Sequence, residues 1–339
     1  MQQPLRAAVI GAGSMGTNHA RVYADLDGVT LVAVADPDTA NATGLAQRYH
    51  CQSYADYRVM LERERLDLVS VVVPTRHHYS VAADVIEAGV PLLIEKPIAA
   101  SVQQGRALIE AARRRGVFLT VGHIERYNPA IIALRQQLEQ HELGRVFQIA
   151  ARRVGPFPSR IMDVGVVIDL ATHDLDILRY LTGQGIARMQ VELGRHLHNA
   201  HEDLLSAILR FDDGVIGMLD INWLTPTKIR ELSVIGERGM FVANYLTQDL
   251  IFYENDSCRG GQWPHLAVLG VSEGRMIRHK IQRREPLREE LLAFCRAVRL
   301  GEPPLVSGED ALVALELAHR LVAIGHSAQP IHALEAQAL

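Results

Sequence analysis

The sequence has little cysteine, little surplus charge and no long hydrophobic run. Its 339 residues include only three cysteines, Cys51, Cys258 and Cys295, and none of them forms a C-x-x-C pair. This gives no indication of a disulfide framework or a zinc site and favours a reducing cytoplasm. The net charge of −4 provides no overall positive field. We therefore expect no nucleic-acid partner, and any anion site must be local.

No apolar run approaches the roughly 20 residues that cross a bilayer. The first expected strand begins by about Leu5, with no charged-then-apolar signal segment before it. We therefore expect no membrane partner. The sequence does have the length for two domains and, at 48% hydrophobic residues, the composition of a globular protein.

A glycine loop follows the first apolar strand, which is expected over 5–10. The loop is GAGSMG at 11–16, and a helical pattern comes after it. In G-x-G-x-x-G, the glycines permit a tight turn, close approach of a pyrophosphate, and close packing of helix on strand. The next apolar run ends in Asp36, 20 residues after Gly16. A carboxylate there can bind a ribose 2′-hydroxyl and repel a 2′-phosphate, which favours NAD over NADP. The residues expected to bind NAD here are Gly11, Gly13, Ser14, Met15, Gly16 and Asp36.

Helices and strands then alternate to about residue 122. Strict alternation predicts a Rossmann-type, doubly wound parallel sheet, and we assign residues 1–122 to an NAD-binding domain. The segment 74–78 is expected to cap one strand at its carboxyl end, with a helix over 79–88 after it. Ligands bind at that end of such sheets, so Pro74, Thr75 and His78 are expected to flank the cofactor. Helix-start residues that point to solvent are the alternative.

A charged pair stands at the end of another buried strand, expected over 90–94. The sequence there is Glu95-Lys96-Pro97. The proline favours an extended conformation at Lys96 and ends the strand. Lys96 is thus expected at the edge of the sheet where the cofactor lies, although a surface lysine is the structural alternative.

The pattern changes after residue 122, and we assign residues 123–339 to a C-terminal α+β domain that binds substrate and forms oligomers. Asn128 before Pro129 predicts the cap of a helix over 130–140. From residue 189, apolar and polar residues alternate with a period of two, which predicts a large, mostly antiparallel open sheet. One face is expected on helices and the other free to pair with another subunit. Helices are also expected over 287–299 and 309–324, with Ser307 as a cap.

Asp169 and His173 lie four residues apart in a predicted helix and share one face. A carboxylate beside an imidazole can orient the ring and raise its basicity, whereas a helix-surface pair is the alternative. Oxidation of a secondary alcohol needs a hydride acceptor and a base. His173 can take the hydroxyl proton, Asp169 can orient it, and Lys96 can stabilise the charge that develops on oxygen. No metal is expected, because the three histidines between 196 and 201 lack a fourth ligand.

Taken together, these motifs resemble the Gfo/Idh/MocA family of oxidoreductases over nearly the whole chain. The resemblance rests on GAGSMG at 11–16, EKP at 95–97 and DLATH at 169–173. It implies the two-domain architecture, NAD, and a catalytic set of Lys96, Asp169 and His173. It also implies that Glu95 holds the nicotinamide ribose, that the Lys96–Pro97 bond is cis, and that the free sheet face makes a homodimer or homotetramer.

Within the family, the segments 122–130 and 153–177 resemble those of the UDP-N-acetylglucosamine 3-dehydrogenases. These enzymes oxidise the sugar 3-hydroxyl with NAD, and a separate aminotransferase then acts on the product on the way to lipid A. Arginine forks suit a pyrophosphate, so Arg152 is grouped with three other arginines near the predicted site. The residues expected to bind the nucleotide sugar are Arg126, Tyr127, Asn128, Arg153, Arg160, Asp169 and His173.

Three alternatives remain open. One is a dehydrogenase of a free polyol or sugar, such as an inositol, which would need no anion site. Another is a hydrolase with bound NAD that breaks a glycosidic bond through a transient 3-keto sugar. The last is a non-catalytic NAD-binding regulator, which would not need Lys96, Asp169 and His173 together.

Overall fold

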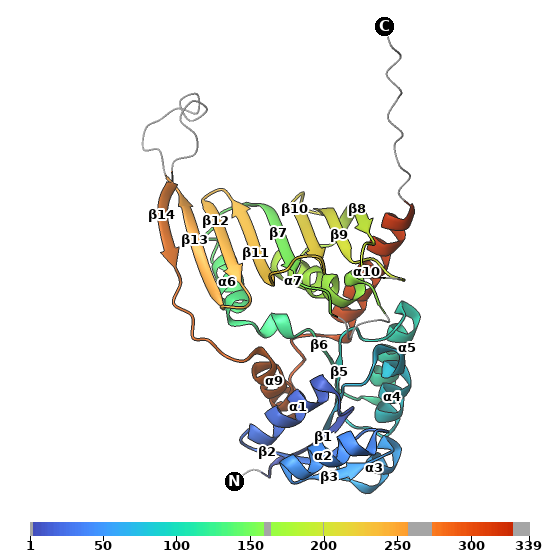
Figure 1. Cartoon of the computed structure of the whole chain (residues 1–339). Helices are drawn as coiled ribbons and strands as arrows, with labels where there is room; N and C mark the ends of the chain where they lie inside the picture. Colours follow the sequence, from blue (N-terminus) through green and yellow to red (C-terminus); the bar gives the residue numbers. More distant parts are fainter. Residues whose placement is uncertain (1–2, 159–163, 199, 257–272, 328–339) are drawn as a thin grey trace.

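The computed structural model describes residues 3–158, 164–198, 200–256 and 273–327. It contains two sheets, one from each half of the chain, with helices around them (Figure 1). The first sheet has six parallel strands in the order β3-β2-β1-β4-β5-β6. Its elements are β1 (Leu5–Ile10), α1 (Ser14–Asp25), β2 (Val29–Ala35), α2 (Thr39–Tyr49), β3 (Gln52–Tyr54), α3 (Tyr57–Arg63), β4 (Leu68–Val71), α4 (Thr75–Glu87), β5 (Leu92–Glu95), α5 (Val102–Arg115) and β6 (Leu119–Gly122).

The strand order of this sheet fixes where a ligand can bind. The chain moves outward from β1 to β3 on one side and from β4 to β6 on the other, so its direction reverses between β1 and β4. A crevice opens at such a point, beyond the carboxyl ends of the strands. The glycine loop follows β1 there. The helix α4 begins at Thr75 rather than at residue 79 as expected, with Pro74 as its cap, so residues 75–78 form its first turn.

The second sheet has eight strands in the order β14-β13-β12-β11-β7-β10-β9-β8, and only the β7–β10 pair is parallel. It is therefore the mostly antiparallel sheet that the period of two predicts. The elements of this half are η1 (Ile124–Tyr127), α6 (Pro129–Glu139), β7 (Val146–Val154), η2 (Val167–Ala171, a π-helical turn), α7 (Thr172–Thr182), β8 (Ile186–Gly194), β9 (Leu204–Phe211), β10 (Ile216–Asn222), β11 (Ile229–Gly236), β12 (Gly239–Asn244), β13 (Asp249–Asn255), β14 (Glu273–Arg278), α9 (Pro286–Leu300) and α10 (Gly308–Ser327).

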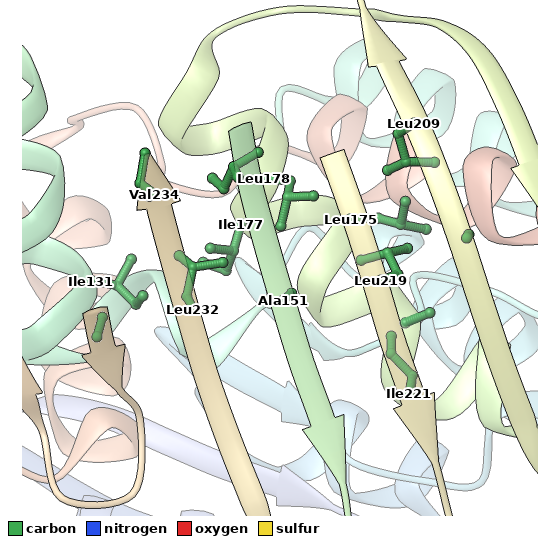
Figure 2. Packing of buried hydrophobic residues seen from close by; sticks show 14 of the residues in the cluster. Ile131, Ala151, Leu175, Ile177, Leu178, Leu209, Leu219, Ile221, Leu232 and Val234 are labelled. Atoms are coloured by element: carbon green, nitrogen blue, oxygen red, sulfur yellow. The ribbon is translucent and has the colours of Figure 1, made fainter. Parts of the chain in front are cut away.

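One face of this sheet packs on helices. Figure 2 shows Ala151 and Leu232 of the sheet against Leu175 and Leu178 of α7. Because side chains alternate along a strand, the next residues point to the other face. That outer face carries polar residues and partly exposed apolar ones such as Ile208.

The two C-terminal helices join the halves of the molecule. α9 follows the second sheet in the chain, yet its Leu291 and Phe294 are buried with Val9 and Leu93 of the first sheet. Residues 286–300 therefore pack with the N-terminal half, although the sequence placed them in the C-terminal domain. Apolar spacing shows which face of a helix is buried but not which sheet covers it. None of the helices in the described part of the chain is long and apolar enough to cross a membrane.

Candidate active site

A cleft of about 1300 Å³ runs from the crevice of the first sheet to the inner edge of the second. The sequence-predicted residues that line it are Gly11, Gly13, Ser14, Met15, Asp36, Pro74, Thr75, His78, Glu95, Lys96, Arg153, Asp169 and His173. Residues from both halves of the chain thus meet in one space. Such a cleft, with a few convergent polar groups, is typical of a binding site.

The glycine loop has the shape that a dinucleotide requires. Gly11 has a φ of +106°, and a Cβ there would lie 2.4 Å from the carbonyl oxygen of Val72. A Cβ at Gly16 would lie 1.8 Å from the carbonyl oxygen of Gly11, so Gly16 serves helix packing and does not line the cleft. Gly13 has nothing within 4 Å of its Cβ position, which leaves room for a phosphate at the start of α1.

Asp36 is held at the edge of the cleft. Its Oδ2 accepts a hydrogen bond from the backbone N–H of Ala12 at 2.6 Å, and its Oδ1 accepts one from that of Asp38 at 2.8 Å. The carboxylate is fixed at the tip of β2, where a ribose hydroxyl of a dinucleotide lies. The residues present therefore fit NAD.

Glu95, Lys96 and Pro97 form an elbow, and the Lys96–Pro97 bond is cis. Glu95 Oε1 lies 3.0 Å from Nε2 of the buried His19. Burial acts to raise the pKa of Glu95, but His19 and Lys96 hold it below its ordinary value. Glu95 is therefore ionised beside the cleft and can accept a hydrogen bond from a ribose hydroxyl.

His78 supports this elbow rather than reaching for the cofactor. Its Nδ1 lies 2.7 Å from the carbonyl oxygen of Pro97, and its Nε2 lies 2.9 Å from that of Val73. Both ring nitrogens thus face the backbone, and the ring ties the end of β4 to the elbow. His78 lines the cleft as predicted, but burial lowers its pKa, so the neutral ring donates to one of these carbonyl oxygens and directs neither nitrogen to a ligand.

Lys96 reaches across the cleft to the second half of the chain. Its Nζ donates to Oδ1 of Asp169 at 2.9 Å and to the carbonyl oxygen of Asp169 at 2.6 Å. The sequence predicted that Asp169 would orient His173, and this partner assignment is wrong, because the carboxylate pairs with Lys96. The two residues lie 73 positions apart, so no local spacing could indicate the contact.

His173 lines the cleft, and its Nδ1 is buried without a hydrogen-bond partner among the described residues. Burial lowers the pKa of His173 well below 6.5, and the nearby cations Lys96 and Arg153 lower it further. The ring is neutral at pH 7 and can accept a proton. Nε2 is the nitrogen left to face a substrate.

Three of the predicted substrate residues lie away from the cleft lining. Arg126 donates to both carboxylate oxygens of Asp176, at 2.8 and 2.6 Å, and to the carbonyl oxygen of Leu305. Tyr127 is buried in the core of the first sheet. Asn128 caps α6, with its Oδ1 accepting from the N–H of Ala130 at 3.1 Å. These side chains hold the junction between the two sheets, so their substrate roles are corrected.

Of the other arginines predicted near the substrate site, one lines the cleft and one does not. Arg153 lines the cleft and is only 1% exposed, with Nε bonded to Asp174, Nη1 bonded to Glu125, and Nη2 unpartnered in the described structure. Arg152, its neighbour on β7, points to the opposite face and pairs with Asp220. Arg160 lies outside the described residues.

Two cations that the sequence reasoning missed also line the cleft, namely Lys228 and Arg230 at the start of β11. Arg230 Nη1 lies 3.8 Å from Oε1 of Glu125. The pKa of Lys228 is lowered, chiefly by the charge of Arg230 and then by burial. Because they are two residues apart, both point to one face of the strand, which is the local signal that could have found them.

Of the three histidines between 196 and 201, His198 has a structural role. Nδ1 of His198 accepts from the backbone N–H groups of Ala200 and His201 at 3.1 and 3.0 Å, and its ring packs on Trp223. Across the described ranges, no group of three or more His, Cys, Asp or Glu residues could hold a metal ion.

Two family models match the chain. The model for the oxidoreductase family with an NAD-binding Rossmann fold (GFO_IDH_MocA) matches residues 5–123, and the GFO/IDH/MocA C-terminal domain matches residues 131–242.

Among characterised relatives, UDP-N-acetylglucosamine 3-dehydrogenase of Acidithiobacillus ferrooxidans is 29% identical over 304 residues, 90% of this chain and 92% of that protein. The scyllo-inositol 2-dehydrogenase (NAD(+)) of Bacillus subtilis is 28% identical over 333 residues, 94% of this chain and 93% of that protein. A solved structure of the Acidithiobacillus ferrooxidans enzyme superposes with a TM-score of 0.84 at 27% identity, covering 95% of this chain and 98% of that chain.

Proposed function

Because the chain belongs to the Gfo/Idh/MocA family of NAD-binding oxidoreductases, we propose that it oxidises the 3-hydroxyl of a UDP-N-acetyl sugar. The reaction converts UDP-N-acetylglucosamine to its 3-keto form. The proposal rests on the cleft described above and on the resemblance to an enzyme of that name.

NAD, when bound by the glycine loop and Asp36, supplies the hydride acceptor. The neutral ring of His173 takes the proton of the substrate hydroxyl, as a general base does. Lys96 donates a hydrogen bond to the reacting oxygen and stabilises the negative charge that develops there. Asp169 holds the ammonium of Lys96 in the same cleft as His173, where both can contact the reacting oxygen.

The observation that carries the substrate class is the positive charge of Lys228 and Arg230. Lys228 makes no ion pair with a carboxylate in the described structure, and its pKa is lowered chiefly by Arg230. Glu125 lies near Arg230 but also binds Arg153, which binds Asp174 as well. Three cations (Arg153, Lys228 and Arg230) therefore face two carboxylates, which leaves one excess positive charge. The pyrophosphate of a nucleotide sugar offsets this charge, whereas a free polyol does not.

A dehydrogenase of a free inositol-type polyol is the second candidate, favoured by the similarity to the inositol enzyme. A panel of UDP-sugars, free sugars and inositols with NAD separates the two. We expect NADH from UDP-N-acetylglucosamine, with activity nearly abolished in Lys96→Met and His173→Ala. Reaction of the polyols alone refutes the nucleotide-sugar proposal. Sugar cleavage without net NADH indicates the glycoside hydrolase instead.

We also propose that two copies pair through the outer face of the second sheet, where Met218 and Ile208 are 40% and 49% exposed. Open sheets with apolar residues on a free face favour such pairing. A homodimer or homotetramer in solution is expected. In the cell, we expect a reducing cytoplasm and a separate aminotransferase that consumes the 3-keto product for lipid A.

A further inference from the structure

A second histidine, His123, lies buried behind His173 and has no role in the reaction as derived so far. It is 2% exposed, and neither of its ring nitrogens has a hydrogen-bond partner in the described part of the chain. The two imidazole rings are nearly perpendicular, with centroids 6.5 Å apart. A buried polar group without a hydrogen-bond partner lowers the stability of the fold. Two such nitrogens on one ring therefore suggest a functional role.

The far side of His123 faces a carboxylate cluster. Its Nδ1 lies 3.8 Å from Oδ2 of Asp176. Asp176 binds the guanidinium of Arg126, and Asp310 lies 3.3 Å from the same guanidinium. One cation therefore serves two carboxylates, which leaves a net charge of −1 beside the ring. Such a charge stabilises a proton on His123.

The remaining charged groups around His123 act in both directions. Burial, Arg126 and Lys96 lower its pKa, whereas Asp176 and Glu95 raise it, and the net pKa is below the ordinary value. His123 is therefore neutral at pH 7 and free to accept a proton. His173 faces the cations Lys96, Arg153 and Arg230, with no carboxylate bonded to its ring in the described residues. A proton is thus stabilised better on His123 than on His173.

The reaction produces one proton that must leave the site. The substrate C–H hydrogen leaves as hydride to NAD, and the O–H proton goes to Nε2 of His173. The balance is alcohol plus NAD⁺ giving ketone, NADH and H⁺. His173 cannot act again until this proton has moved on.

We propose that His123 is a positioning residue that takes this proton from His173, through one bridging water, and holds it beside Asp176. His173 Nδ1–H donates to the water, the water donates to Nε2 of His123, and His173 becomes neutral with the substrate's proton on Nε2. When the ketone leaves, Nε2 gives this proton to solvent in the cleft and the proton held on His123 returns to Nδ1, so that His173 can act again. Nδ1 of His173 and Nε2 of His123 have no partner in the described residues and supply the two polar partners that a buried water needs at least.

This inference rests on the proposed role of His173 as the base. Its test uses His123→Asn, which keeps polar atoms but cannot titrate, and His123→Phe, which keeps the ring shape. The control is His319→Asn at an exposed position of α10. Steady-state oxidation is measured with the panel substrate that the wild type oxidises fastest.

We expect kcat to fall at least about tenfold in both His123 variants, since proton transfer by a positioned group contributes 10²–10⁴-fold in general. KM should stay within about twofold, because His123 does not line the cleft. The kcat of His123→Asn should rise with the concentration of a small buffer base, whereas that of the wild type and the control should not. A merely structural role would not produce this buffer dependence.

Two results overturn the proposal. One is a kcat in His123→Asn within twofold of the wild type. The other is a loss of kcat that is insensitive to buffer and has the pH profile of the wild type. Failure of the proposed function gives other results. In that case His173→Ala keeps wild-type activity, or the UDP-sugars do not react.

Discussion

The cation pair at the start of β11 gives a direct prediction about substrate class. Lys228→Gln and Arg230→Gln each remove one positive charge from the cleft while keeping polar atoms. If the pair binds a pyrophosphate, each variant should weaken binding of the nucleotide sugar. A free sugar or polyol carries no negative charge for these two cations to bind. Its KM should therefore not change in either variant.

The expected rise in KM depends on how far each side chain is exposed to solvent. A hydrogen bond to a charged group contributes about 1.5–3 kcal/mol, and about 1.4 kcal/mol changes a binding constant tenfold. Lys228 is exposed, and solvent screening brings its loss to about tenfold or less in KM. The Arg230 side chain is 24% exposed, so its loss should reach about tenfold to a hundredfold.

The assay is the initial rate of NADH formation against the concentration of UDP-N-acetylglucosamine and of free N-acetylglucosamine. Arg238→Gln is the control, because Arg238 is exposed in the turn at the end of β11 that is far from Lys228 and Arg230. An unchanged KM for the UDP-sugar in both variants would refute a pyrophosphate site at Lys228 and Arg230. A rise in KM for the free sugar by the same factor would refute it equally.

Three further predictions follow from the site and its supports. Asp36→Ser should raise kcat/KM with NADP at least about tenfold, because a like charge facing the 2′-phosphate is removed; parallel assays with NAD and NADP measure this. Arg126→Met should lower the free energy of unfolding by about 3–5 kcal/mol, because it leaves the buried Asp176 unpaired, and an added Asp176→Leu should restore most of the loss in urea unfolding. The folded state keeps His123 and His173 neutral, whereas the unfolded chain binds protons near pH 6.5, so the free energy of unfolding should fall as pH drops below about 6.5. Urea unfolding on both sides of that pH checks the sign, and a slope that is the same in His123→Phe would contradict it.

The sequence was sufficient for those parts of the site that depend on neighbours in the chain. The glycine loop, the acidic residue after β2 and the elbow at 95–97 each follow a strand, and local patterning placed every one of them at the cleft. The same holds for the period of two in the second sheet.

What the sequence could not show depends on contacts between distant positions. Arg126 was expected to bind substrate, but it meets Asp176, 50 residues away, and its charge is used within the fold. Asn128 caps α6 by a local contact, as the sequence predicts, and this contact turns its side chain away from the cleft. Lys228 and Arg230 reach the cleft because β11 pairs with β7, a register that no local pattern fixes. Long-range pairing thus decides which of several polar residues lies in the cleft.

In the proposed reaction, hydride passes from C3 of a UDP-N-acetyl sugar to NAD. The most direct test is incubation of the protein with NAD and UDP-N-acetylglucosamine that carries deuterium at C3, followed by mass spectrometry of the reduced cofactor. We predict one deuterium in the NADH and a slower rate than with the unlabelled sugar. Unlabelled NADH from this substrate, or NADH only from inositols, would contradict hydride transfer from C3 of the UDP-sugar.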